Sequence, residues 1–304
     1  MKKRRRVIVL IVLAILLAAG IAAGLDPSAR VHGWIAGEPF YQGRSATAWR
    51  RDLRQPDSPR STEAFEALVA GKGEAVPVCA WLVRSAPEPE ARWRAADALG
   101  RIGKDAAPAA PELVAALSDR DALVRAVAVR AVGELAPDVA GAVPALVGLF
   151  PDVEAIRAVS RFGPAGAEAV LKLIELLRHE DATIRWQAAR TLGKIRESAV
   201  ASVPELIRLT GSDPEPLVRE HAAEALGDMG PAAAAGIPAL VQALKDPVAR
   251  VRRDAVRALG QMGPAANGSL GEVRVAVTDP DADVKAAAAR AVRLIDPAAS
   301  EKKE

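Results

Sequence analysis

Apolar and polar positions alternate with the period of an α-helix along most of this chain. In the stretch "VREHAAEALGDMG", residues 218–230, the apolar positions are Val218, Ala222, Ala225, Leu226 and Met229. Spacings of this kind place all of them on one stripe of a helix. The stretch therefore predicts an amphipathic helix, with Gly227 near its end and Leu226 in the core.

The same pattern recurs along the chain. Clear copies are "ARWRAADALGRIG" at 91–103, "VRAVAVRAVGELA" at 124–136, "IRWQAARTLGKIR" at 184–196, "VRRDAVRALGQMG" at 251–263 and "VKAAAARAVRLID" at 284–296. Weaker copies are "STEAFEALVAG" at 61–71 and "VEAIRAVSRFG" at 153–163. Positions equivalent to Gly227 mostly lie roughly 33 residues apart, and a fixed period of this length predicts a solenoid. The copy at 153–163 is shorter than the others, which predicts a kink near residues 150–153.

Each copy also contains a preceding helix, which often opens with a proline. Proline suits the first turn of a helix, where its missing N–H would have no partner. The prolines concerned are Pro77, Pro111, Pro144, Pro204 and Pro238. One helix pair cannot bury both of its apolar stripes, so neighbouring pairs must stack. We therefore predict an all-α solenoid over residues 45–296, with about eight helix pairs.

The pattern resembles HEAT repeats, specifically the short bacterial kind that also occurs in phycobilisome lyase-type proteins. The resemblance rests on the first-helix proline, an acid in the turn, and Val-Arg and Ala-Leu-Gly in the second helix. It implies a hydrogen-bonded ladder of acids and bases between repeats. The predicted members are Asp121 with Arg125, Asp181 with Arg185, Glu215 with Arg219, and Asp281 with Lys285. The ankyrin T-P-L-H box and the tetratricopeptide pattern are absent from the sequence.

The N-terminus predicts export from the cytoplasm. Residues 2–6 are cations, and residues 7–25 are uncharged and mostly apolar. About 20 such residues cross a bilayer as a helix, and the cations stay on the cytoplasmic side. A cleaved signal peptide, with "AAG" at 22–24 as its cleavage site, is the alternative, although its apolar core is usually shorter. We predict an uncleaved transmembrane anchor at 7–25, a cytoplasmic stub at 1–6 and the rest outside the cytoplasm.

The remaining segments and the charge distribution complete the domain plan. Residues 26–44 fit no repeat and are predicted to form a linker and an N-terminal cap, and residues 297–304 form a charged tail. The formal net charge is +3, but residues 2–6 alone contribute five positive charges. The rest of the chain is therefore slightly acidic, which argues against a nucleic-acid partner.

Candidate catalytic chemistry is sparse. A HEAT-repeat enzyme, deoxyhypusine hydroxylase, holds two irons with His-Glu pairs, and this chain has only His179-Glu180 and the reversed Glu220-His221. Such a site needs four histidines, and His32 is the only other one. We therefore predict no metal and no cofactor. A bilin-lyase activity rests on the repeat resemblance alone. Cys79 has no partner for an intrachain disulfide and is predicted to be a small buried residue.

A partner-binding surface is predicted on the second helices. Positions seven before, three before and one after the glycine share a face away from the apolar stripe, which lines the concave side of a HEAT-like solenoid. Arginines cluster there beside an exposed tryptophan, the composition of an interface hot spot. The predicted residues are Arg130, Arg157, Arg161, Trp186, Arg190 and Lys194. Arginine matches carboxylates, so an acidic peptide or protein segment is the expected partner.

The sequence thus favours a membrane-tethered, extracytoplasmic, non-catalytic protein-binding scaffold. Two alternatives stay open. The first is an enzyme of the bilin-lyase or HEAT-repeat hydroxylase kind. The second is a purely structural spacer, in which the tryptophan and arginines form only cation–π contacts on a solvated face.

Overall fold

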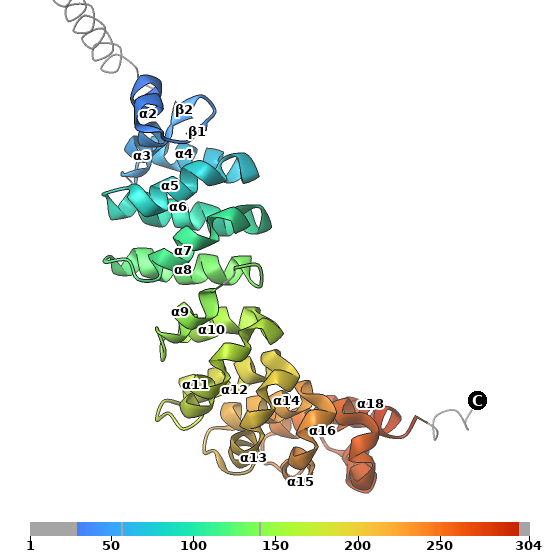
Figure 1. Ribbon diagram of the computed structural model, residues 1–304. Helices are drawn as coiled ribbons and strands as arrows, with labels where there is room; N and C mark the ends of the chain where they lie inside the picture. Colours follow the sequence, from blue (N-terminus) through green and yellow to red (C-terminus); the bar gives the residue numbers. More distant parts are fainter. Residues whose placement is uncertain (1–28, 56, 140, 298–304) are drawn as a thin grey trace, which may run out of the picture. The chain divides into compact units, whose positions relative to one another are not determined.

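The computed structural model describes residues 29–55, 57–139 and 141–297, and most of them lie in helices (Figure 1). The chain divides into two compact units, Met1–Val139 and Ala140–Glu304. Each unit is a stack of helix pairs. This arrangement confirms the predicted all-α repeat solenoid.

The first unit begins with a cap. The helix α2 (Arg30–Ala36) precedes two short antiparallel strands, β1 (Phe40–Tyr41) and β2 (Arg44–Ser45). This hairpin was not predicted from the hydropathy pattern. Its turn residues Gln42 and Gly43 both have positive φ angles. The buried side chain of Trp49 fixes the hairpin on the stack, since its Nε1 donates to the Tyr41 carbonyl at 3.2 Å.

Three helix pairs follow the cap in the first unit. They are α3 (Ala46–Leu53) with α4 (Pro59–Ala70), α5 (Val76–Ser85) with α6 (Pro89–Ile102), and α7 (Ala110–Ala116) with α8 (Ala122–Leu135). Two short 3-10 helices, η1 (Lys72–Glu74) and η2 (Gly103–Ala109), connect successive pairs.

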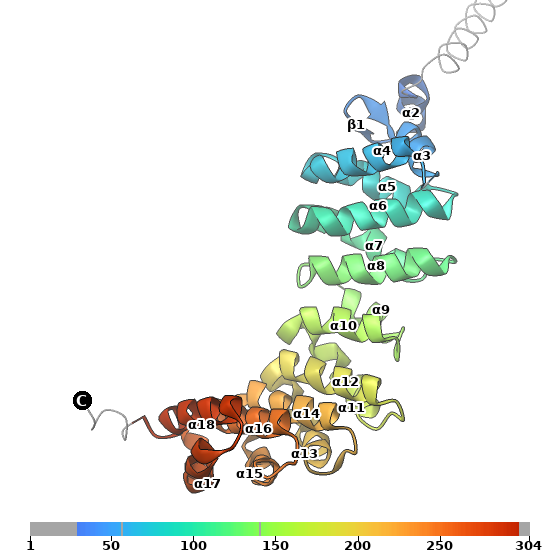
Figure 2. The same cartoon turned by 180° about the vertical axis from the view of Figure 1, so that it is seen from behind.

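The second unit contains five helix pairs within its described residues, 141–297 (Figure 2). They are α9 (Ala142–Val147) with α10 (Val153–Arg161), α11 (Val170–Leu176) with α12 (Ala182–Ile195), α13 (Val203–Ser212) with α14 (Pro216–Asp228), α15 (Ile237–Ala243) with α16 (Ala249–Met262), and α17 (Leu270–Val275) with α18 (Ala282–Ile295). The 3-10 segments are η3 (Gly163–Ala169), η4 (Arg196–Ser202), η5 (Gly230–Gly236), η6 (Gly263–Ser269) and η7 (Ala276–Thr278).

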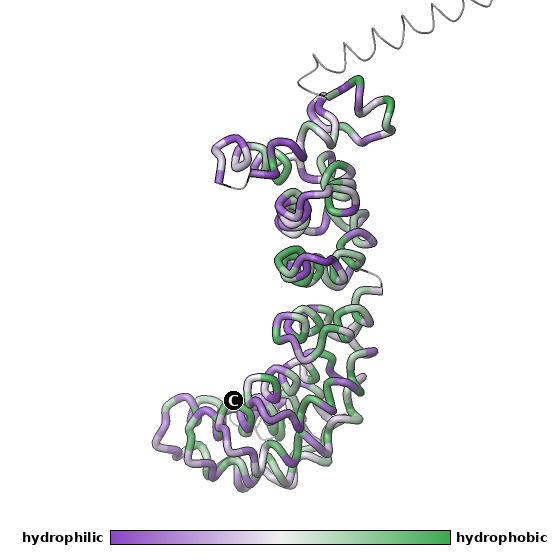
Figure 3. The backbone as a smooth tube through the Cα atoms, turned by 90° about the vertical axis from the view of Figure 1, so that its left-hand side faces the viewer, coloured by the Kyte–Doolittle hydropathy of each residue, from purple (hydrophilic) through white to green (hydrophobic). Residues whose placement is uncertain are grey.

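Each unit has two layers of helices. The second helices of neighbouring pairs pack side by side, and the first helices cover one face of that layer. Hydrophobic and hydrophilic stretches alternate along the chain in both units (Figure 3). Leu226 is fully buried, as its place on the apolar stripe predicted. The layer is close-packed at Gly227, where an added Cβ would lie 2.7 Å from the Cα of Ala258.

The predicted helix starts agree with the structure at most positions. Pro77, Pro111, Pro204 and Pro238 each occupy the first or second position of a first helix. Pro144 differs, because it is the third residue of α9. Prolines also open α4, α6 and α14, which the repeat pattern did not predict.

The predicted membrane segment at residues 7–25 lies outside the described residues, as do the stub at 1–6 and positions 298–304 of the tail. Within residues 29–55, 57–139 and 141–297, no helix combines the length and the apolar character needed to cross a bilayer. The anchor therefore stays a prediction from sequence.

A ladder of ion pairs links neighbouring repeats. In the second unit, Arg185 Nε and Nη2 donate to both carboxylate oxygens of Asp213, at 2.8 and 2.9 Å. The Nη1 of Arg185 also donates to the carbonyls of His179 and Glu180. The equivalent pairs are Arg92 with Asp119, Arg219 with Asp246, and Arg252 with Asp279. Each arginine therefore joins the turn before its own helix to the turn of the following repeat.

The acids of this ladder differ from those that the sequence predicted, because the ladder aspartate lies two residues earlier in the turn. Its carboxylate accepts the N–H of the residue two positions later, as Asp213 does from Glu215, and this turns it toward the preceding repeat. The predicted acids Asp121, Asp181 and Asp281 instead cap the N-termini of α8, α12 and α18. Glu215 precedes α14 without a side-chain capping bond.

Two of the predicted ladder bases, Arg125 and Lys285, form no ladder pair with an acid among the described residues. Arg125 donates to the carbonyls of Asp119 and Arg120, which belong to its own turn. Lys285 lies on α18, and no further repeat follows within the described residues to supply an acid. The bases Arg92 and Arg252 belong to the ladder but were missed.

One rung of the ladder has a different composition in the second unit. His179 occupies the position of the ladder aspartate, and its Nδ1 accepts the N–H of Asp181 at 3.0 Å. In the preceding short repeat, the residue eight before the position equivalent to Gly227, where the ladder arginine lies in other repeats, is Asp152, the N-cap of α10. Acid and base are thus replaced together, which leaves no buried charge without a counter-charge.

Candidate functional site

The second helices of the second unit, α10, α12, α14, α16 and α18, share a surface opposite the first helices; we call it the arginine face. Contacts between neighbouring helices show that it is continuous. The Arg157 guanidinium on α10 lies 2.8 Å from the Gln187 amide on α12, with the amide oriented so that its oxygen accepts. The Trp186 ring on α12 stacks on the His221 ring on α14, with centroids 5.0 Å apart.

The centre of this face is a charge network. Lys194 Nζ lies 2.7 Å from Asp228 Oδ2 and 3.5 Å from Glu224 Oε1, and His221 Nδ1 lies 2.8 Å from Glu224 Oε2. The hydrogen bond with His221, assisted by Lys194 and opposed by burial, lowers the pKa of Glu224 to about 2. Glu224 is therefore ionised at neutral pH. Lys194 is shared between two carboxylates, those of Glu224 and Asp228.

Two buried acids lie beside the network. Asp254 accepts from Arg253 at 2.8 Å and from Arg257 at 3.1 Å. Glu220 lies 3.3 Å from Arg253, but its Oε2 has no hydrogen-bond partner within the described part of the chain. Burial, followed by the charge of Asp254, raises the pKa of Glu220. Glu220 is thus a structural group turned into the layer.

Two arginines of the face carry charges that this network does not use. Arg190 on α12 and Arg290 on α18 are both exposed. Among residues 29–55, 57–139 and 141–297, neither has an ion pair or a side-chain hydrogen bond. Both lie three residues before the position equivalent to Gly227 in their repeats, as do Arg157 and Arg257. Their guanidinium groups are free to bind carboxylates of another molecule.

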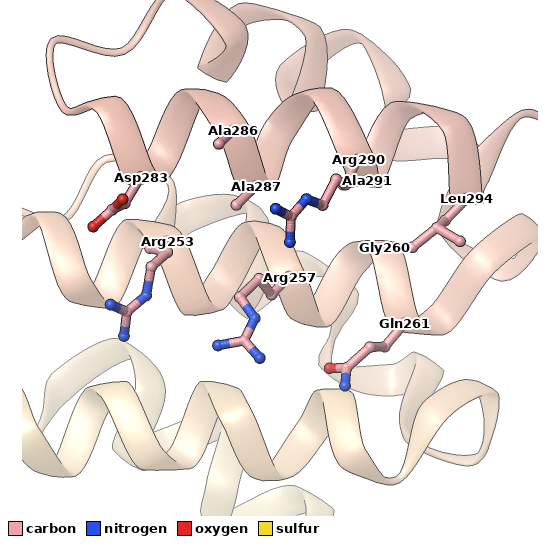
Figure 4. A pocket seen from close by; sticks show the side chains of 10 residues that line it. All are labelled: Arg253, Arg257, Gly260, Gln261, Asp283, Ala286, Ala287, Arg290, Ala291 and Leu294. Carbon is pink, nitrogen blue, oxygen red and sulfur yellow. The ribbon is translucent and has the colours of Figure 1, made fainter. Parts of the chain in front are cut away.

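A groove of about 570 Å³ lies beside Arg290, between α16 and α18 (Figure 4). Figure 4 shows Arg257 and Arg290 near its middle, with Gln261 and Leu294 toward one end. Its floor is made of small residues, since an added Cβ at Gly260 would lie 3.0 Å from the Cα of Ala291. The groove therefore offers the guanidinium of Arg290, unpaired among the described residues, and that of Arg257, which also donates to Asp254, above a small apolar floor beside the exposed side chain of Leu294.

The sequence itself contains a signal for this groove. We count positions back from the residue equivalent to Gly227 in each repeat. Seven and six residues before it, the neighbouring repeats have large polar or aromatic side chains, for example Arg253 and Asp254. In the last repeat these two positions are Ala286 and Ala287. The side chains that fill the space between earlier helices are therefore missing between α16 and α18.

The structure places the predicted binding residues in two separate units. Arg157, Arg161, Arg190 and Lys194 lie on the arginine face together with Trp186. Arg130 lies on α8 of the first unit, where it pairs with Asp97 at 2.7 Å. Five of the six residues therefore share the arginine face, and Arg130 belongs to the other unit.

The prediction of an exposed tryptophan at position 186 was wrong. Trp186 is half-buried because His221 of the next repeat covers one side of its ring. The periodicity of one helix identifies its outer face, but it cannot show what the neighbouring helix places against that face. The Trp186–His221 stack supports the layer as well as lining the surface.

The histidines considered as metal ligands, His179 and His221, contact different residues. His179 accepts a main-chain hydrogen bond in its turn, and His221 lies between Trp186 and Glu224. Within the described ranges, no three His, Cys, Asp or Glu side chains are grouped so that they could hold a metal ion. Cys79 is fully buried, and burial raises the pKa of its thiol to about 12.

Comparison with known families agrees with this architecture. A family model of HEAT repeats matches residues 75–160, 152–227 and 237–302. The chain belongs to the HEAT-repeat family. A model of the PBS lyase HEAT-like repeat also matches residues 218–246, which include most of α14 and the turn residue Asp246. The resemblance inferred from the repeat pattern is thereby confirmed.

Solved structures show the same fold at low identity. A crystallised engineered protein is 24% identical, with a TM-score of 0.56, and the match covers 91% of this chain and 83% of that one. A mutant of Kap121p is 14% identical with a TM-score of 0.59, covering 82% of this chain and 33% of Kap121p.

A more distant match is the CpcE–CpcF complex of phycocyanin lyase from a Nostoc species. It is 20% identical with a TM-score of 0.43, and the match covers 49% of this chain and 97% of that one. A likeness this weak carries no functional argument. Comparison with curated proteins finds no match.

Proposed function

We propose that this protein is a membrane-tethered, extracytoplasmic HEAT-repeat scaffold that binds an acidic segment of a partner protein on its arginine face, without catalysing a reaction. The observation that carries the binding proposal is the pair of exposed guanidinium groups, Arg190 and Arg290, without partners within the described residues. Carboxylates are the natural ligands of such groups because the guanidinium fork can donate two parallel hydrogen bonds.

The groove between α16 and α18 supports a peptide-like ligand. Its volume of about 570 Å³ can accept side chains of an extended segment. Arg257 and Arg290 would bind acidic side chains, while Leu294 and the alanines of the floor contact apolar parts. Asp283 at the rim would disfavour a second carboxylate at its own end. The ligand should therefore alternate acidic and apolar residues.

The test uses fluorescence anisotropy with a labelled peptide of glutamate and leucine, and a glutamine–leucine peptide as the neutral reference. We expect salt-dependent binding of the acidic peptide only. The double change Arg190→Glu with Arg290→Glu should weaken binding by at least about tenfold, since each lost charge-assisted hydrogen bond contributes about 1.5–3 kcal/mol. Equal binding of both peptides would contradict the proposal.

A matched control separates local recognition from net charge. Lys245→Glu with Arg274→Glu changes the net charge equally, and neither residue lies on the arginine face. We expect this control to bind the acidic peptide nearly as well as the parent. If both doubles lose binding equally, the arginine face is not the site.

Tethering and export are tested separately. A reporter that is active only outside the cytoplasm, fused after Glu304, should be active. The apolar character of residues 7–25 and the preceding cations support this orientation. The mass of the mature protein then distinguishes an anchor from a cleaved signal peptide. An active cytoplasm-only reporter at the same position would refute export.

A further inference from the structure

The N-terminal cap of the first unit carries an unusual exposed apolar pair. Trp34 and Ile35, consecutive residues of α2, are 81% and 66% exposed. Phe40 of the adjacent strand is also exposed. Among the described residues of this unit, the only other large hydrophobic side chain that is exposed is Leu123. Exposed apolar surface is thus concentrated at one end of the unit.

The opposite side of α2 is fixed against the cap. Gly33 is buried, and an added Cβ there would lie 2.4 Å from the Cβ of Ser45. Arg30 Nε donates to the carbonyl of Gly43 in the hairpin turn. These contacts determine which face of α2 packs on the unit. Trp34 and Ile35 therefore point outward because of the packing of the helix.

Only a short segment of sequence separates the apolar residues 7–25 from the cap. Residues 26–28 alone separate Leu25 from Ala29, the first described residue. At the maximal reach of about 3.5 Å per residue up to Arg30, and about 1.5 Å per residue within α2, Trp34 lies within about 24 Å of Leu25 along the chain. This reach exceeds the thickness of one headgroup layer, which is about 6 Å.

We propose that α2 rests on the membrane surface, with Trp34 and Ile35 inserted at the boundary between lipid headgroups and acyl chains. Tryptophan is enriched at this boundary because its ring has a large apolar surface and one polar N–H. The inference rests on the proposed tether at residues 7–25, which holds the cap beside the bilayer. A second contact beside the anchor restricts how the first unit rotates about it.

The experiment uses the full chain in vesicles of phosphatidylcholine and phosphatidylglycerol. An Ile35→Cys variant is labelled with an environment-sensitive fluorophore, which keeps Trp34 in place. Cys79 remains unlabelled because it is fully buried and its thiol pKa is raised to about 12. The readout is quenching by lipids that carry a quencher near the headgroup. Flotation of the vesicles reports independently whether the protein is tethered.

We expect the label at position 35 to be quenched several-fold more than a label in Leu123→Cys, which lies on α8 of the same unit and is 53% exposed. Adding Trp34→Ser to the Ile35→Cys variant should reduce the quenching, since it removes the larger inserted side chain. The fold of both variants is checked by their helicity.

Three outcomes would overturn the inference. Equal quenching at positions 35 and 123 in protein that floats would refute the surface contact and leave the tether intact. Protein that fails to float would refute the tether and the contact with it. Disulfide-linked dimers of unlabelled Ile35→Cys protein on the vesicles, without lipid quenching, would show that a second copy covers α2.

Discussion

Arg185 and Asp213 meet through two parallel hydrogen bonds, of 2.8 and 2.9 Å, between consecutive repeats. Both side chains are largely withdrawn from solvent. Asp213 also accepts the N–H of Glu215, so one carboxylate organises its own turn and holds the preceding repeat. The pair is a structural element of the stack rather than a part of the binding surface.

Asp213→Ala is therefore expected to destabilise the second unit by up to about 3–5 kcal/mol, since it leaves the largely withdrawn Arg185 guanidinium without its carboxylate partner. Urea unfolding followed by far-ultraviolet circular dichroism measures the change. The matched control is His179→Ala, at the equivalent position of the rung that has no arginine. It removes one hydrogen bond and should cost about 1 kcal/mol. Equal losses in the two variants would show that the ion pair adds nothing.

Gly227→Ala is expected to destabilise the stack by about 1–3 kcal/mol, because the added methyl would overlap backbone atoms of α16. The ideal Cβ lies 2.7 Å from Ala258 Cα, which cannot move aside as a flexible side chain can. Gly271→Ala on α17 is the control, since no atom lies within 4 Å of its added Cβ. That variant should be neutral or stabilising by up to about 1 kcal/mol. Thermal unfolding of the two variants decides the comparison.

Glu205→Gln is expected to remove a contribution to stability that depends on pH. Hydrogen bonds from Arg178 and then from Arg208 lower the pKa of Glu205 to about 2, below its ordinary value of 4.5. A lowered carboxylate pKa stabilises the folded state above the unfolded pKa, and this contribution disappears as the pH falls toward the folded pKa. The parent should therefore be more stable than the variant at pH 7, by a difference that shrinks between about pH 4.5 and pH 2. A constant difference in urea midpoints across this range would contradict the assignment.

Glu220→Gln should show the opposite sign. Burial, with the nearby charge of Asp254, raises the pKa of Glu220 above its ordinary value of 4.5. A carboxyl whose folded pKa is raised favours the folded state below the unfolded pKa, and this advantage is lost as the pH rises through the folded pKa. The neutral amide avoids that loss. The variant should therefore be more stable than the parent at pH 7 and approach it at pH values below about 4.5, as measured by thermal unfolding. Glu220 also forms ion pairs with Arg253 at 3.3 Å and with Arg250 at 3.6 Å, and lower stability of the variant at pH 7 would show that these pairs dominate.

The helices and their stacking were predictable because they depend on local periodicity. The apolar stripe that contains Val218 and Leu226 requires a partner surface whatever the details of the fold, and the repeat supplies the same surface in the next unit of sequence. The first-turn prolines also follow from short-range backbone chemistry. Asp181, in contrast, was predicted as a ladder acid and instead caps α12.

The identity of the ladder acids required the tertiary structure. Asp213 and Glu215 are both acids in the same short turn, and only the path of the turn decides which carboxylate faces Arg185. At position 179 a histidine replaces the ladder aspartate, and this replacement can be recognised in the sequence only once the position is known to belong to the ladder.

The binding surface was likewise decided by contacts between repeats. Helical periodicity placed Trp186 and Arg190 on the outer face of α12, but His221 of the next helix covers the tryptophan and leaves the arginine free. The groove beside Arg290 exists because Ala286, Ala287 and Gly260 leave space between two particular helices. Local sequence sets the conformation of one helix, whereas exposure depends on side chains that lie about 33 residues away in the chain and are brought together only by stacking.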